Sequence, residues 1–263
     1  MPSVSPDGKK LAYVEQVDHS LAIRVSGLDG LNIKTLTDGG MNLIPSWFPD
    51  SDQLVFMKVN PKPKQDPARN AKIYFINIVT GKTKRLFTDK EQLKYSNAMP
   101  VISPNGEQIA FISDRSGEMR VWVSALDGSG AKQLSKPEKN FHDEIKAPFE
   151  QKVPAWSPDG KWIAHWEGVE MIHMSRFTGI PNPKRDQLIA STFSVWVVGE
   201  DGIGRRKIGR GDDPTWSPDG FVTRAFPDSS RGGPVVMART SNGEKMLPIV
   251  PPARNWGRFC WIP

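Results

Sequence analysis

A short motif, Pro-x-x-Ser-Pro-Asp-Gly, recurs along this chain of 263 residues and constrains the fold more than any other feature. Three copies are complete and begin at Pro2, Pro154 and Pro214, and two weaker copies begin at Pro45 and Pro100. The central prolines of the five copies are Pro6, Pro49, Pro104, Pro158 and Pro218. Successive copies are therefore 43, 55, 54 and 60 residues apart. Repeats of about 40–45 residues with four strands each are typical of β-propellers, and longer steps leave room for inserted loops.

The residues after each motif follow one order of strands and turns. A short apolar strand is expected next, at Leu11–Val14, Leu54–Met57, Ile109–Ile112 and Ile163–Trp166. A third strand is expected at Ile73–Ile76, Val121–Val123 and Val195–Val198. A tight turn then ends in Gly30, Gly81, Gly128, Gly202 or Gly243, where glycine supplies the positive φ that short hairpins need. A fourth strand closes the unit, as at Lys34–Thr37 and Lys132–Ser135.

No single unit of this kind can bury both faces of its small sheet, so the units must stack around an axis. We therefore predict an all-β fold with one β-propeller domain over residues 1–263. Its four-stranded blades are expected at approximately 1–40, 41–95, 96–149, 150–210 and 211–256.

The number of blades depends on the last residues of the sequence. Trp261-Ile262-Pro263 aligns with Trp216-Ser217-Pro218 of the fifth motif, so residues 257–263 resemble an opening strand. A terminal strand that completes the first blade would remove two exposed sheet edges. We favour five blades in a ring closed by the terminal strands, with a six-bladed ring as the alternative.

The repeat also resembles a known family. The recurring Pro-x-Trp-Ser-Pro-Asp-Gly, the Ile-Ala-Phe-like strand and the turn Asp114-Arg115-Ser116-Gly117 are similar to the propeller repeat of the bacterial TolB family. The resemblance covers essentially the whole chain and implies a TolB-like binding scaffold in the periplasm or outside the cell. The same repeat occurs in propellers attached to peptidases and in lyases similar to oligogalacturonate lyase. We expect no peptidase domain, because the repeats occupy the sequence throughout.

Composition excludes several other classes. A formal net charge of +6 is too small, over this surface, to indicate a nucleic-acid partner. No run of apolar residues is long enough for a membrane span, and the amino terminus reads as repeat and not as an export signal. The single cysteine, Cys260, excludes an internal disulfide framework. We expect a monomer.

The predicted connections differ in length between the two faces of the repeat. The turns between the first and second strands and between the third and fourth are minimal. The extra residues fall in the other connections, at Val59–Lys72, Lys136–Lys152, Glu167–Thr192 and Pro227–Pro234. Long loops are uncommon unless they are functional or disordered. We therefore expect the ligand on the face that carries these loops, and plain scaffold on the other.

The candidate ligand-binding residues on the looped face are His142, Asp143, Glu144, His173, Arg176, Arg231 and Trp256. Imidazoles and carboxylates together could bind a metal or exchange protons. Arginine binds carboxylates bidentately, and flat aromatic rings suit sugars or a partner's side chains. The spacing matches no metal-binding signature, so no firm metal or catalytic site is assigned. Of the other histidines, we expect His165 to be a packed core residue.

These residues support two functions. The first is a non-catalytic scaffold, without a cofactor, that binds a protein or peptide. The alternative is a polysaccharide lyase acting on acidic oligosaccharides, with His142 or His173 as the base and Arg176 or Arg231 on the uronate carboxylate; a divalent metal would fit this chemistry. A lectin that uses the same carbohydrate-binding residues is disfavoured, because the inserts differ strongly between repeats. We favour the scaffold.

Overall fold

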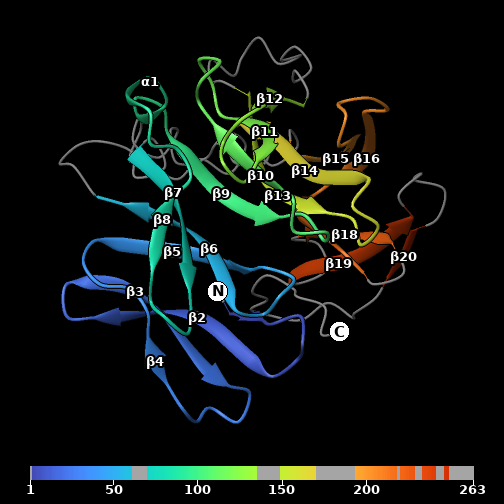
Figure 1. Cartoon of the computed structure of the whole chain (residues 1–263). Coiled ribbons are helices and arrows are strands. Elements are labelled where there is room, and N and C mark those ends of the chain that lie inside the picture. Colours follow the sequence, from blue (N-terminus) through green and yellow to red (C-terminus); the bar gives the residue numbers. More distant parts are fainter. Residues whose placement is uncertain are drawn as a thin grey trace, which may run out of the picture. The chain divides into compact units, whose positions relative to one another are not determined.

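The computed structural model describes residues 2–60, 70–134, 149–169, 193–217, 220–228, 233–240 and 246–248. Nearly all of their regular structure is β-strand, as Figure 1 shows, and this confirms the predicted all-β fold. The one helix of the described residues is the short α1 (Lys90–Leu93), for which Asp89 is the N-cap. None of the described helices is long and apolar enough to cross a membrane.

Each of the five sequence motifs belongs to one repeat of four strands, and the first strand of the repeat leads into the motif. Repeat 1 contains β1 (Ser3–Val4), β2 (Lys10–Val17), β3 (Ser20–Gly27) and β4 (Lys34–Thr35). Repeat 2 contains β5 (Met41–Trp47), β6 (Gln53–Val59), β7 (Ala71–Asn77) and β8 (Thr83–Arg85). Repeat 3 contains β9 (Asn97–Ile102), β10 (Gln108–Ser113), β11 (Arg120–Ala125) and β12 (Lys132–Gln133). Repeat 4 contains β13 (Phe149–Trp156), β14 (Trp162–Val169), β15 (Ser194–Gly199) and β16 (Arg206–Arg210). Repeat 5 contains β17 (Asp212–Trp216), β18 (Phe221–Asp228), β19 (Gly233–Thr240) and β20 (Met246–Pro248).

Within each repeat the strands pair in chain order as an antiparallel meander. Repeats 3, 4 and 5 are separate four-stranded sheets, whereas repeats 1 and 2 share one sheet through a single parallel pairing of Leu21 with Met41. The predicted second, third and fourth strands all overlap observed strands, so the order of strands within the repeat is confirmed. The predicted closing strand, 257–263, lies outside the described residues.

The described chain divides into two compact units. Unit 1 contains the described residues of 1–117 together with Trp122–Lys132, and unit 2 contains Glu118–Val121 and the described residues from Gln133 onward. In unit 1, one cluster of buried apolar residues includes Phe48, Phe75 and Phe111, and another includes Ile23 and Phe56. In unit 2, Ala164, Val195, Val197, Ile208 and Trp216 form the core cluster.

Hydrogen bonds explain why the motif recurs. In repeat 1 the Ser5 hydroxyl donates to Asp7 Oδ1 at 2.5 Å and accepts the Lys10 amide at 2.9 Å. Asp7 Oδ1 also accepts the Lys9 amide at 3.1 Å, so the carboxylate fixes the turn; these hydrogen bonds lower the pKa of Asp7. The same bonds recur at Ser103, Asn105 and Gln108 in repeat 3 and at Ser157, Asp159 and Trp162 in repeat 4. In four of the five repeats a glycine in the left-handed conformation ends the turn: Gly8, Gly106, Gly160 and Gly220.

The tryptophan of the motif links one repeat to the next. Trp47 donates from its indole nitrogen to the Ser3 carbonyl, 2.8 Å away in the first strand of the preceding repeat. Trp216 makes the corresponding bond to the Ala155 carbonyl at 3.0 Å. Both rings are buried, so each bond joins neighbouring first strands while the ring fills the space between them.

Candidate functional site

All seven predicted ligand-binding residues lie outside the described residues: His142, Asp143, Glu144, His173, Arg176, Arg231 and Trp256. Their convergence on one face stays a prediction. Among the described residues, no group of three or more His, Cys, Asp or Glu side chains could hold a metal ion. The two described histidines differ: His19 is exposed between β2 and β3, whereas His165 is buried in β14.

His165 belongs to a buried ionic cluster of unit 2. Its Nε2 lies 3.2 Å from Glu167 Oε1, and both side chains are essentially inaccessible to solvent. Arg205 donates from Nη2 to the same carboxylate oxygen at 2.7 Å, and its guanidinium lies 3.7 Å from the centre of the Trp196 ring. Because Trp196 pairs with His165 across β14 and β15, the cluster occupies one sheet. The prediction that His165 is a packed core residue is confirmed.

The charge of Glu167 depends on these neighbours. Burial by itself would raise the pKa of Glu167, because a carboxylate loses solvation in the interior. The hydrogen bond and charge of His165 and the charge and hydrogen bond of Arg205 outweigh burial, and the pKa of Glu167 is lower than usual. A carboxylate held ionised inside the sheet fixes the positions of His165 and Arg205, so we assign the cluster a structural role.

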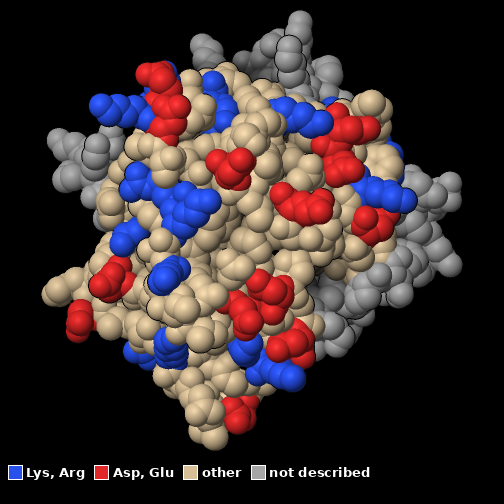
Figure 2. Space-filling view, viewed as in Figure 1, with Lys and Arg blue, Asp and Glu red and all other residues tan. Residues whose placement is uncertain are grey.

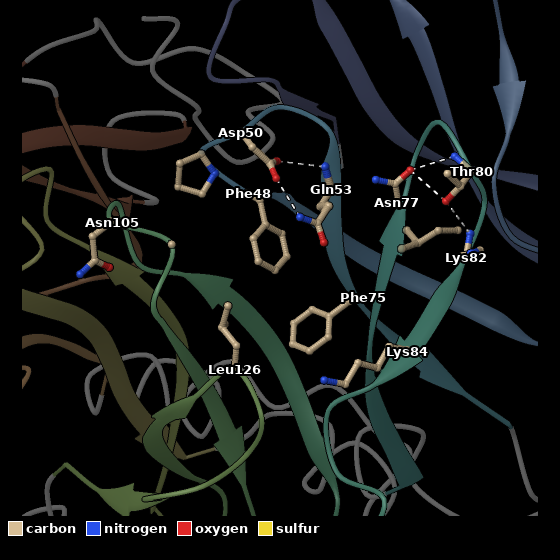
Figure 3. Close-up of a pocket in the computed structure, with 13 residues that line it drawn as sticks. Phe48, Asp50, Gln53, Phe75, Asn77, Thr80, Lys82, Lys84, Asn105 and Leu126 are labelled. Carbon is tan, nitrogen blue, oxygen red and sulfur yellow. Dashed lines mark hydrogen bonds between the residues drawn. The ribbon is translucent and has the colours of Figure 1, made fainter.

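A pocket with a mixed lining lies in unit 1, between the short turns of repeats 2 and 3 (Figure 3). Its volume is about 620 Å³, which falls in the range of small-ligand and peptide-side-chain pockets. The lining combines apolar and polar side chains: Phe48, Pro49, Asp50, Gln53, Phe75, Ile76, Asn77, Thr80, Lys82, Lys84, Asn105, Gly106 and Leu126. This pocket is the candidate functional site of the described chain.

A departure from the motif forms the floor of the pocket. Phe48 stands where four of the five copies have serine, at Ser5, Ser103, Ser157 and Ser217. Its buried ring packs edge-on against Phe75, with centroids 5.6 Å apart, and the partly buried Leu126 packs against the same cluster. Figure 3 shows Phe48, Phe75 and Leu126 converging at the centre of the pocket. Without the serine hydroxyl, the repeat 2 turn is completed in another way.

The Asp50 carboxylate supplies the side-chain hydrogen bonds of that turn. Its Oδ1 accepts the amides of Asp52 at 2.9 Å and Gln53 at 3.1 Å, and its Oδ2 accepts the Gln53 side-chain amide at 2.8 Å. On the opposite wall, Asn77 Oδ1 accepts the amide and hydroxyl of Thr80 at 2.8 and 3.0 Å. These bonds fix the polar rim, and Figure 3 draws those between Asp50 and Gln53 and between Asn77 and Thr80.

Two lysines of the rim are placed differently. Lys82 precedes β8 and Lys84 lies within it, opposite Phe75 in the register of β7 and β8. In the described part of the chain, neither ammonium group forms a hydrogen bond or ion pair, whereas the nearby Lys72 and Arg85 bond to Tyr95 O and the Tyr74 hydroxyl. Figure 2 shows lysine and arginine side chains gathered over β7 and β8. The site therefore combines two lysines that form no ion pair among the described residues with an apolar floor.

Sequence reasoning missed this pocket, because it assigned the short-turn side to scaffold. One signal was present. The serine recurs in four copies because its hydroxyl forms hydrogen bonds in the turn. Phenylalanine at the same position cannot form those bonds, so the replacement indicates a different role for that residue in repeat 2. Phe48 marks the repeat that forms the pocket.

Comparisons with known proteins agree with the repeat. The family model described as the TolB beta propeller domain matches residues 1–176. A Protein TolB homolog of Chlorobium luteolum is 29% identical over 157 residues, which cover 50% of this chain and 34% of that protein. The chain thus spans about a third of this relative.

Solved structures share the fold. The crystal structure of TolB from Acinetobacter baumannii matches 93% of this chain and 52% of its own, with a TM-score of 0.65 and 20% identity. An oligogalacturonate lyase from Vibrio parahaemolyticus matches 97% of this chain and 66% of its own, with a TM-score of 0.61 and 13% identity. At these identities the likeness concerns the fold alone. The family match covers about two thirds of the residues, and this chain belongs to the TolB β-propeller domain family.

Proposed function

We propose that this chain is a non-catalytic binding scaffold that engages a protein or peptide. The observation that carries the proposal is the pocket of unit 1, whose lining combines Lys82 and Lys84 with the apolar Phe48 and Phe75 and whose rim is fixed by hydrogen bonds. A preformed pocket with an apolar floor and a few convergent polar groups is suited to recognition. Membership of the TolB β-propeller domain family supports a binding scaffold, and on that basis we propose a periplasmic or secreted location.

The proposal includes the arrangement of the repeats. We propose a ring of five blades closed by the terminal strands. The long connections, with His142, His173, Arg176 and Arg231, would add a second contact surface for the partner.

Blocking the pocket tests the proposed function. In a Cys260→Ser background, Thr80→Cys introduces one thiol at the pocket wall, and a bulky maleimide attached there would fill the space. On an array of short peptides, we expect the unlabelled protein to bind a defined set, and the labelled protein to lose that set by at least about tenfold.

The matched control is Lys9→Cys in the same background, which places the label on the exposed turn of repeat 1. It should leave peptide binding unchanged. An array in which pocket labelling changes nothing, or in which no peptide binds, would contradict a binding role for this pocket.

A polysaccharide lyase is the second candidate, because the fold is also that of oligogalacturonate lyase. A lyase leaves an unsaturated uronate that absorbs in the ultraviolet. Under the scaffold proposal, incubation with oligogalacturonate and a divalent metal should give no such absorbance. Absorbance that His142→Ala or His173→Ala abolishes would replace the scaffold with the lyase.

A further inference from the structure

We propose that the pocket of repeats 2 and 3 binds an extended acidic segment of a partner protein, with one apolar side chain on the floor and carboxylates on Lys82 and Lys84. This inference rests on the proposed function and adds the chemistry of the ligand. Three features of the pocket support it independently.

The first feature is the difference between the acidic and the basic side chains of the pocket in their hydrogen-bond partners. The Asp50 carboxylate accepts three hydrogen bonds from its own turn. Asp127, on the neighbouring turn of repeat 3, accepts the Ser129 amide at 2.8 Å; hydrogen bonds from Ser129 and, more weakly, the charge of Lys84 lower its pKa. The acidic groups are thus hydrogen-bonded within their own turns, while the ammonium groups of Lys82 and Lys84 form no hydrogen bond or ion pair among the described residues. The charge left for a ligand is positive, and an acidic ligand complements it.

The second feature is the spacing of the two lysines. Lys82 immediately precedes β8, Lys84 lies within it two residues further on, and both line the pocket. Residues at this spacing on an extended strand lie on one face, about 7 Å apart. An extended peptide places its own alternate side chains at the same interval. Two acidic residues separated by one residue could therefore form ion pairs with both lysines. A small dicarboxylic acid could not form both ion pairs and also fill the pocket.

The third feature is the floor. Phe75 lies directly opposite Lys84 between β7 and β8, so an apolar surface adjoins the cation. Figure 3 shows the Lys84 side chain extending past Phe75 toward Leu126. The replacement of serine by Phe48 supplies the rest of this surface, at the expense of the hydroxyl hydrogen bonds that the other described copies keep. An apolar side chain beside the acidic residues would cover the floor and exclude water from the ion pairs.

Charge reversal tests the inference. Three fluorescent peptides are compared by anisotropy: one with Glu-Val-Glu next to Leu, one with both Glu replaced by Lys, and one with Leu replaced by Ser. We expect wild type to bind the first at least about tenfold more tightly than the second, and more weakly at high salt. The double variant Lys82→Glu/Lys84→Glu should invert this order, and the Ser peptide should bind wild type more weakly than the Leu peptide.

The control is Lys9→Glu/Lys161→Glu, which makes the same change of net charge on exposed turns and should keep the wild-type order. An unchanged order in the pocket variant would overturn the inference, as would glutarate binding without binding of the acidic peptide. Array peptides that are lost on blocking the pocket but are not acidic would leave the scaffold proposal standing and refute only the ligand class.

Discussion

Replacing Glu167 with Gln should lower the free energy of unfolding by about 3 kcal/mol, because it leaves buried charge without its partner. The Glu167 carboxylate is 1% exposed and is shared by His165 and Arg205. In the variant, a neutral amide meets the Arg205 guanidinium, whose side chain is only 19% exposed and lies against Trp196. Chemical denaturation at neutral pH, monitored by tryptophan fluorescence, measures the change.

The matched control is Glu15→Gln. Glu15 forms an ion pair with Arg24 at 2.8 Å, but the Glu15 side chain is 47% exposed. Exposed pairs contribute about 0–1 kcal/mol, so this variant should remain close to wild type. Equal losses at the two positions would show that burial does not strengthen the cluster of unit 2, and would contradict its structural role.

The same variant makes a prediction about pH. Because the folded pKa of Glu167 is lowered, its carboxylate stabilises the fold above the unfolded pKa of about 4.3. That contribution is lost as the pH falls through the lower, folded value. The difference in unfolding free energy between wild type and Glu167→Gln should therefore shrink below about pH 4. A difference that is constant from neutral to acid pH would show that the charge of Glu167 is not what stabilises the cluster.

The all-β class and the order of strands within the repeat could be predicted from the sequence, because each copy of the repeat specifies its own local structure. The Ser-Pro-Asp-Gly hydrogen bonds close within a few residues, so each copy of the motif specifies its own turn and the strand after it. The bond of Trp47 to the preceding repeat then fixes how neighbouring first strands meet. A short motif that recurs at regular intervals can be recognised from a single sequence, and so can the repeat fold that it specifies.

The site was harder to predict for a physical reason. A pocket depends on side chains far apart in the sequence, here Phe48, Lys84 and Leu126, and no short pattern encodes their convergence. The lengths of the connections predicted a site on the long loops, whose candidate residues lie outside the described residues. The informative feature was a broken pattern. Phe48 replaces a serine whose hydrogen bonds are kept in the other described turns. Such an exception indicates that the residue has a role in its own repeat, here in the floor of the pocket, that the other repeats lack.

Equivalent glycines in two repeats offer the sharpest test of packing. Gly30 and Gly128 both follow Asp in the tight turn after the third strand, with φ of 77° and 84°, and each amide bonds to a carbonyl three residues earlier at 3.0 Å. Alanine at either position must adopt a left-handed conformation that costs about 1 kcal/mol. The two sites differ only in what surrounds the new methyl group.

Gly128→Ala should therefore destabilise the protein by about 2–4 kcal/mol, and Gly30→Ala by about 1 kcal/mol. A Cβ at Gly128 would lie 2.8 Å from two carbons of the Phe87 ring and 3.3 Å from the Leu86 carbonyl, whereas a Cβ at Gly30 meets nothing within 4 Å. The ring cannot easily yield, because Phe87 is buried against Phe111 and beneath the Arg115 guanidinium. Equilibrium denaturation of the two variants side by side measures the difference. Equal losses would mean that the Phe87 ring moves freely, and that the turn of repeat 3 is not held by the core of unit 1.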